Sequence, residues 1–273
     1  MTLMETLYLP QALFAKDFKH VYEPAEDTFI LLDALENDLN TLKNSSHICL
    51  ECGSGSGVVI TSIAKSFQSA LSNNQQQNGS IHSDALTANR LLFATDINFS
   101  ACKTTQKCAT YFGQEHNIQV IQTDLAECLV ERLENSVDLL VFNPPYVPTE
   151  QAEMLHAKQQ TGITNPKTSN KGSKKHRIDL AWAGGRHGRQ VIDIFLKQYV
   201  KRLLSKPNGV AYMVALEANN IDDLTKCLRS KDTGEDKDDE NDIIGSVVLK
   251  RRAGSENLYV LKYQHYNGRG KNK

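Results

Sequence analysis

The chain has 273 residues, of which 40% are apolar and 23% are charged, and its mean hydropathy is −0.42. This composition excludes a membrane protein and a wholly disordered chain, and no stretch approaches the roughly 20 apolar residues of a membrane span. The net charge is −1, which counts against a DNA or RNA substrate because domains that hold a nucleic-acid backbone are usually far more basic.

The predicted elements alternate between helices and strands. Helices are predicted at 24–36, 58–67, 100–112 with Ser100 as its N-cap, 124–133, 190–204 and 219–229, and strands at 47–51, 91–96, 118–122, 137–143, 209–216, 243–250 and 257–263. Apolar strands separated by helices predict a mostly parallel sheet covered on both faces, and the last two strands predict an antiparallel edge hairpin. The fold class is therefore α/β: a doubly wound, Rossmann-like, seven-stranded sheet that binds ligands at the carboxyl ends of its strands.

Three segments, at about 71–90, 150–178 and 231–242, differ from the rest in composition and are interpreted as insertions. The first is polar and of low complexity, the second is rich in Lys, Asn and Gly, and the third is a run of charges. All three are expected as solvated loops, although the basic second segment could also contact an acidic substrate. The remainder is the size of one α/β domain, so we predict a single domain over 1–273 with its core at about 20–265.

Cys49 and Cys52 form a C-x-x-C pattern inside an apolar strand. Residues three apart on a strand point to opposite faces, so this pair cannot hold one metal ion or close a disulfide. We expect buried thiols, no metal site and a reducing compartment: the cytoplasm, with the nucleus as a second location. The N-terminus has no basic-then-apolar layout of a secretory signal.

A glycine-rich turn follows the first strand, with Glu51 closing the strand and Gly53, Gly55 and Gly57 alternating after it. Glycines at this place let a ligand approach the backbone, where a Cβ would block it. The second strand ends in Asp96, and a carboxylate there accepts hydrogen bonds from ribose hydroxyls, in NAD and S-adenosylmethionine alike.

The third strand is followed by Asp124 and Leu125. The Asp124 carboxylate could accept a hydrogen bond from an adenine amino group, or it could serve as the N-cap of the next helix. The residues alone leave both interpretations open.

The fourth strand ends in the sequence Asn143-Pro144-Pro145-Tyr146. The prolines lack N–H groups and hold the backbone extended, so the Asn143 side-chain carbonyl and the Pro144 main-chain carbonyl can face one ligand as acceptors. Two converging acceptors fit a planar –NH₂ group, and Tyr146 offers a face for a flat amide or base. A rigid turn would explain the prolines but not their two neighbours.

The order of these motifs resembles the class I S-adenosylmethionine-dependent methyltransferases that act on exocyclic or amide nitrogens. Two further segments, at 22–28 (YEPAEDT) and 181–189 (AWAGGRHGR), resemble the HemK/PrmC group, which methylates the glutamine of the Gly-Gly-Gln tip of translation release factors. The likeness runs from about 22 to 263 and is strongest to the eukaryotic and archaeal branch. The insertions and Cys52 after Glu51 depart from the family pattern.

The resemblance implies a protein-glutamine N-methyltransferase with S-adenosylmethionine as cofactor. The implied cofactor-binding residues are Thr28, Glu51, Gly53, Gly55, Asp96, Asp124 and Leu125, and the implied substrate-binding residues are Asn143, Pro144, Pro145 and Tyr146, of which Asn143, Pro144 and Tyr146 are also catalytic. Residues 182–185 would either help to wall the pocket or pack a loop against a helix.

The implied partners are a class 1 release factor as substrate and a small zinc-binding activator that adds its sheet to the strand at 118–122, giving a heterodimer. The chain's own loops could cover that edge instead. Other functions remain open at this point: an adenine amino methyltransferase acting on a flipped base, a histone lysine methyltransferase, an NAD-dependent oxidoreductase, or a non-catalytic scaffold. The glycine spacing disfavours the oxidoreductase, and the intact Asn-Pro-Pro-Tyr disfavours the scaffold.

Overall fold

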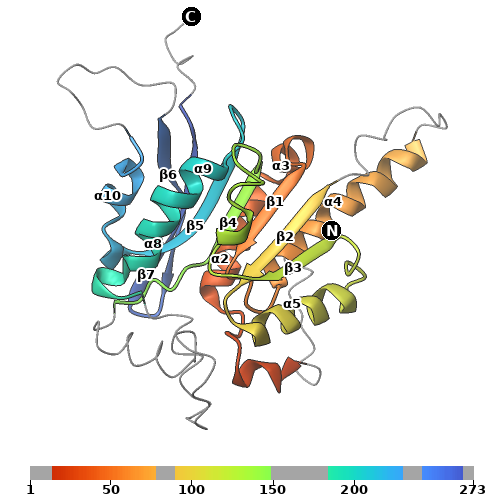
Figure 1. Cartoon of the computed structure of the whole chain (residues 1–273), viewed down its shortest axis with the longest axis horizontal. Helices are drawn as coiled ribbons and strands as arrows, with labels where there is room; N and C mark the ends of the chain where they lie inside the picture. Colours follow the sequence, from red (N-terminus) through yellow and green to blue (C-terminus); the bar gives the residue numbers. More distant parts are fainter. Residues whose placement is uncertain (1–13, 78–89, 149–183, 230–241, 267–273) are drawn as a thin grey trace, which may run out of the picture.

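The computed structural model describes residues 14–77, 90–148, 184–229 and 242–266. Seven strands form one sheet in the order β3-β2-β1-β4-β5-β7-β6 (Figure 1). Their bounds are β1 Ile48–Cys52, β2 Leu91–Asp96, β3 Ile118–Gln122, β4 Leu139–Phe142, β5 Val210–Leu216, β6 Ile243–Ala253 and β7 Glu256–His265. All pairs from β3 to β5 are parallel, and β7 is antiparallel to both of its neighbours. The predicted fold class is confirmed.

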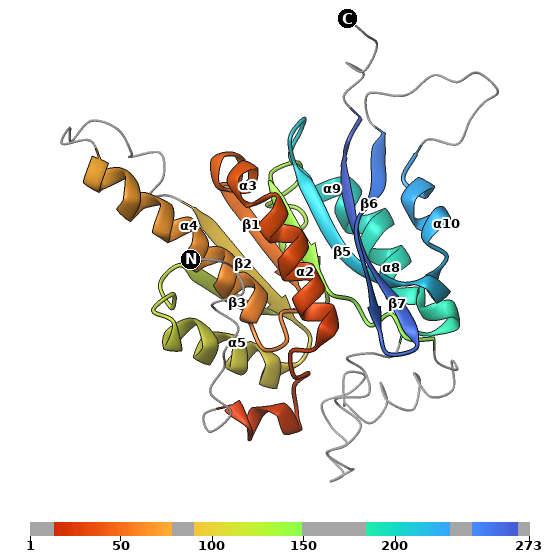
Figure 2. The same cartoon turned by 180° about the vertical axis from the view of Figure 1, so that it is seen from behind.

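Helices cover both faces of the sheet (Figures 1 and 2). One face carries α2 Glu26–Asn37, α3 Leu39–Ser45, α4 Val58–Gln77 and α5 Phe99–Tyr111. The other carries α8 Gln190–Ile194, the π-helical η5 Phe195–Val200, α9 Lys201–Leu203 and α10 Ile221–Lys226. The 3-10 helices are η2 Asp17–Lys19, η3 Glu127–Leu129, η4 Arg186–Gly188 and η6 Glu217–Asn219. None of the helices in the described ranges is long and apolar enough to cross a membrane.

The sheet separates two buried apolar clusters, as alternation along each strand requires. On β1, Cys49 packs into the cluster under α2 and α4, whereas Leu50 and Cys52 pack into the cluster under α8 and η5. The predicted opposite orientation of the two thiols is therefore confirmed. Burial raises the pKa of the Cys52 thiol to about 12, so the thiol stays protonated at neutral pH and is a poor nucleophile.

Three expectations about local structure were wrong. The segment predicted as a helix at 124–133 contains only the 3-10 helix η3, because Leu125 takes a left-handed backbone conformation with φ +45° at its start. The cap of α5 is Asn98, which accepts from Ser100 N–H, rather than Ser100. Helix α4 continues to Gln77, so the first seven residues of the insertion at 71–90 are helical. The other two insertions lie outside the described residues, except for Asp242.

Candidate active site

The strand order reverses between β1 and β4, and the glycine-rich turn leaves the carboxyl end of β1 at this point. Its glycines serve different purposes. At Gly57 (φ +78°) a Cβ would lie 2.6 Å from Thr105 Cα, so this glycine permits close packing of α5. At Gly55 (φ +53°) the only atom of the described residues that a Cβ would meet within 4 Å is the Gly53 carbonyl oxygen, at 4.0 Å. The backbone at Gly55 therefore borders open space, as a cradle for a ligand requires.

Glu51 lies beneath this turn and is 3% exposed. Its carboxylate accepts a hydrogen bond from Ile60 N–H at 3.0 Å, in the first turn of α4. Burial raises the pKa of Glu51 well above its usual range. The contact ties the end of β1 to the start of α4 and so fixes both ends of the glycine-rich turn.

Asp96 ends β2 beside the same turn. Its two carboxylate oxygens accept hydrogen bonds from Gly55 N–H at 2.9 Å and Asn98 N–H at 2.8 Å. Burial raises its pKa, although these backbone donors offset part of the effect. A carboxylate offers about four acceptor positions, so Asp96 can orient the turn and still accept a hydroxyl group from a ligand.

Asp124 and Leu125 follow β3 at the same edge of the sheet. The N-cap of η3 is Ala126, without a side-chain cap, so the interpretation of Asp124 as a helix N-cap was wrong. The Asp124 side chain is exposed. Leu125 is half-buried and left-handed, a conformation that costs about 1–3 kcal/mol for a bulky residue and is concentrated at functional sites. Sequence reasoning could not detect this strain.

Asn143 carries the most informative atom of the site. Within the residues that the structure describes, its Oδ1 is buried and has no hydrogen-bond partner. Leaving a buried acceptor unsatisfied costs about 1–3 kcal/mol, and Asn143 stands where β4 ends beside Pro144. Among the described residues the site thus contains a buried acceptor without a donor, which matches an external N–H group.

The first turn of α2 lies against this loop. The Tyr146 hydroxyl donates to Asp27 Oδ2 at 2.7 Å, and the Tyr22 hydroxyl donates to the same oxygen at 3.1 Å. The other oxygen of Asp27 accepts from Thr28 N–H at 2.7 Å. Burial and the Asp27 carboxylate raise the pKa of Tyr146 far above its ordinary value, so its hydroxyl stays protonated and keeps donating.

Neither Asp27 nor Tyr22 was assigned a role from the sequence, although both belong to the segment at 22–28. The hydrogen bond from Tyr146 to Asp27 spans 119 residues of sequence. Only the fold brings these two residues together. Thr28 is buried next to them, and its Oγ1 accepts from Ala25 N–H at 3.4 Å.

The glycine-rich segment before α8 packs on the loop that follows β4. Gly184 N–H donates to the Val147 carbonyl at 2.8 Å, and a Cβ at Gly184 would lie 2.6 Å from the Pro145 carbonyl oxygen. The packing interpretation of 182–185 therefore describes Gly184, while Trp182 lies outside the described residues. The structure brings the motifs at 22–28, 143–146 and 184–189 into one cluster at the carboxyl ends of β1 and β4.

The mixed sheet with β7 reversed, the glycine-rich turn at the switch point, the acid after β2 and the Asn-Pro-Pro-Tyr after β4 define a class I methyltransferase. No protein-family model matches the chain. It is 39% identical over 246 residues to methyltransferase HEMK2 of Homo sapiens and 34% identical over 257 residues to the eRF1 methyltransferase catalytic subunit mtq2 of Schizosaccharomyces pombe, with 90% of each chain covered in both cases. The chain belongs to the HEMK2 family of methyltransferases.

More distant similarities extend to a release factor glutamine methyltransferase of Moorella thermoacetica, which is 28% identical over 51% of this chain and 41% of its own length. Among solved structures, a chain of the E. cuniculi Mtq2–Trm112 complex is 22% identical, with a TM-score of 0.49 over 90% of this chain and 99% of that chain.

Proposed function

We propose that this chain transfers a methyl group from S-adenosylmethionine to the side-chain amide nitrogen of the glutamine in the Gly-Gly-Gln tip of a translation release factor. Its S. pombe relative is named an eRF1 methyltransferase subunit, and its M. thermoacetica relative a release factor glutamine methyltransferase. The observation that carries the proposal is the buried, unpartnered Oδ1 of Asn143, because a primary amide brings the N–H donor that this acceptor lacks.

The residues present fit the cofactor. The open backbone at Gly55 and the acceptor positions left on Asp96 would hold its nucleoside, and Asp124 with Leu125 would contact its adenine. Thr28, next to Asp27 and so near the Asn-Pro-Pro-Tyr loop, would contact the methionine end of the cofactor. When bound, S-adenosylmethionine supplies a methyl group already activated by a positively charged sulfur.

An amide nitrogen is a poor nucleophile because its lone pair is delocalised into the carbonyl group. The chain therefore contributes mainly by placing the nitrogen, and such positioning is worth up to ~7–11 kcal/mol. Acceptors from Asn143 and Pro144 on the two N–H bonds would fix the amide and stabilise positive charge that develops on nitrogen. The Tyr146 ring, held by Asp27, would wall the flat amide.

We also propose that a small zinc-binding activator binds the β3 edge of the sheet and that the heterodimer works in the cytoplasm. β3 pairs only with β2 in the described sheet, and an open strand edge suits pairing with a second sheet. Gln122, its last residue, donates to the Ile97 carbonyl, and the side chains of Ile97 and Phe99 are 41% and 55% exposed; we propose these side chains as apolar surface beside the edge.

The test is mass spectrometry of the methylated product. The chain and the activator are incubated with S-adenosylmethionine and a release factor, and in parallel with duplex DNA and with histone. Methylation of the Gly-Gly-Gln glutamine supports the proposal. Methylation of adenine or lysine alone overturns the assigned substrate, and absence of any product despite cofactor binding overturns the proposed activity.

A further inference from the structure

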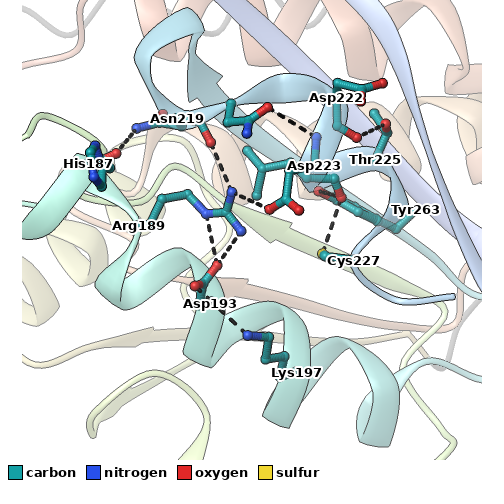
Figure 3. Close-up of polar contacts among 12 residues, drawn as sticks. His187, Arg189, Asp193, Lys197, Asn219, Asp222, Asp223, Thr225, Cys227 and Tyr263 are labelled. Carbon is teal, nitrogen blue, oxygen red and sulfur yellow. Dashed lines mark hydrogen bonds and ion pairs between the residues drawn. The ribbon is translucent and has the colours of Figure 1, made fainter. Parts of the chain in front are cut away.

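Asn219 is fully buried and contacts the Asn-Pro-Pro-Tyr loop that follows β4. It ends η6, directly after β5, and its amide group uses both of its hydrogens and its oxygen. Its Nδ2 donates to the Tyr146 carbonyl at 2.8 Å and to the His187 carbonyl at 2.9 Å (Figure 3 shows the second contact). Its Oδ1 accepts from Leu216 N–H at 2.7 Å. One side chain thus joins the β4 loop, the segment before α8 and the end of β5.

The segment before α8 is shaped to allow this arrangement. Gly188 has φ +67°, and a Cβ there would lie 1.8 Å from the Tyr146 carbonyl oxygen and 2.5 Å from Asn219 Nδ2. His187 is also left-handed, with φ +57°, and its carbonyl meets Asn219. Strained backbone of this kind persists only where its surroundings impose it, and it marks functional regions.

Arg189 fixes Asn219 from the surface side. Its guanidinium donates to the Asn219 carbonyl at 3.0 Å and to Asp223 at 2.7 Å, while Asp193 receives two further bonds at 2.9 and 2.6 Å (Figure 3). Burial lowers the pKa of Arg189, but the two carboxylates raise it more, so the net shift is upward. The arginine is permanently charged, and only 15% of its side chain is exposed.

Tyr146 is consequently held at two points. Asp27, on α2, accepts from its hydroxyl, and Asn219, at the end of η6, donates to its carbonyl. Because Pro144 and Pro145 make the intervening backbone stiff, fixing Tyr146 also fixes the direction of Asn143 and the Pro144 carbonyl, three and two residues earlier.

We infer that Asn219, braced by Arg189, is a positioning residue for methyl transfer: it sets the placement of the Asn-Pro-Pro-Tyr loop without touching substrate or cofactor. This inference deepens the proposed function and rests on it for the identity of the substrate. The loop placement itself can be measured without any substrate.

The test variant is Asn219→Asp, in the full chain co-expressed with the activator. The replacement keeps the side-chain shape and the acceptor for Leu216 N–H, but it turns the double donor into an oxygen that faces two carbonyls. The matched control is Gln114→Glu. Gln114 is 2% exposed and makes two amide hydrogen bonds at the amino end of β3, away from the site. Three quantities are compared: kcat with a release factor, cofactor affinity by calorimetry, and hydrogen–deuterium exchange.

In Asn219→Asp we expect faster exchange confined to the peptides at 143–148 and 184–189. We also expect a fall of about 10²-fold in kcat, as for a reacting group misplaced by about 1 Å, with cofactor affinity changed less than about threefold. Gln114→Glu should lose comparable thermal stability and keep its kcat. Unchanged exchange in the two peptides, an unchanged kcat, or an equal loss of kcat in the control overturns the inference.

If wild-type chain methylates no release factor, the proposed substrate fails, and the exchange comparison still decides whether Asn219 holds the loop. A second variant covers poor folding of the first. Arg189→Lys keeps the charge but loses the planar fork, and it should lower kcat about tenfold with exchange raised in the same peptides. Because both residues act on one loop, the double variant should be no slower than Asn219→Asp within about threefold; additive losses overturn the shared mechanism.

Discussion

The unpartnered acceptor of Asn143 predicts an unusual combination of effects for Asn143→Ala: loss of activity without loss of stability. Removing a buried acceptor that has no donor relieves about 1–3 kcal/mol, and the truncation forfeits about 1 kcal/mol of packing. The net effect on the free energy of unfolding should be about +1 kcal/mol. For a domain of this size, that raises Tm by about 2–4 °C.

The same substitution should lower kcat by about 10²–10³-fold, as removal of one preorganised group at a developing charge does. Thermal unfolding, calorimetric titration with S-adenosylmethionine and single-turnover kinetics give the three numbers. Asn98→Ala is the comparison for stability: unlike Asn143, Asn98 uses both ends of its amide, accepting from Ser100 N–H and donating to the His20 carbonyl, and its loss as a helix cap should cost about 1 kcal/mol. A Tm of Asn143→Ala that falls as far as that of Asn98→Ala, or a parallel loss of cofactor affinity, would refute the reasoning.

Two further predictions concern the surroundings of the site, and a third concerns the proposed activator surface. Asp27→Asn should lower kcat and reduce stability by about 2 kcal/mol, measured by urea unfolding, because two tyrosine hydroxyls lose a charged acceptor; a variant with wild-type kcat would contradict the role of Asp27. The raised pKa of Glu51 means that the folded chain binds more protons than the unfolded chain just above pH 4.5, so stability falls as pH rises through that window. Glu51→Gln should flatten this decline in unfolding midpoints measured from pH 5 to 7.5, and an unchanged slope would show that another group causes it. Phe99→Glu should weaken activator binding at least tenfold by calorimetry, with Tm of the chain alone unchanged because an acid suits the first turn of α5; unchanged binding would remove this surface from the interface.

The sheet could be predicted from sequence because its strands are local signals, and the Asn-Pro-Pro-Tyr segment stands out in the same way, although its catalytic role stays a prediction. Strands such as β2 and β3 are apolar runs with clear ends, and their predicted bounds agree with the structure. The prediction of a helix at 124–133 was wrong although its apolar residues have helical spacing. The same side chains pack from successive tight turns because Leu125 takes a left-handed backbone conformation. The start of α5 was ambiguous because Asn98 and Ser100 are both good caps.

What sequence could not supply was the support behind the motif. Asp27 and Asn219 reach Tyr146 across 119 and 73 residues, and nothing in the local sequence of any of the three predicts these contacts. The unpaired Asn143 oxygen is likewise a property of the assembled interior. The domain bounds and the three insertions as connecting segments stay predictions.

Among the described strands β3 pairs only with β2, and this edge has a consequence for how much of the chain accumulates in a cell. If the proposed activator binds there, a newly made chain would expose this side of β3, together with the exposed Ile97 and Phe99 side chains, until the activator binds. Exposed strand edges promote self-association, and chains that fail to reach the stable state are degraded. The amount of this chain that accumulates should therefore follow the supply of the proposed activator. Overproducing this chain without the activator should yield aggregated or degraded chain rather than more methyltransferase activity.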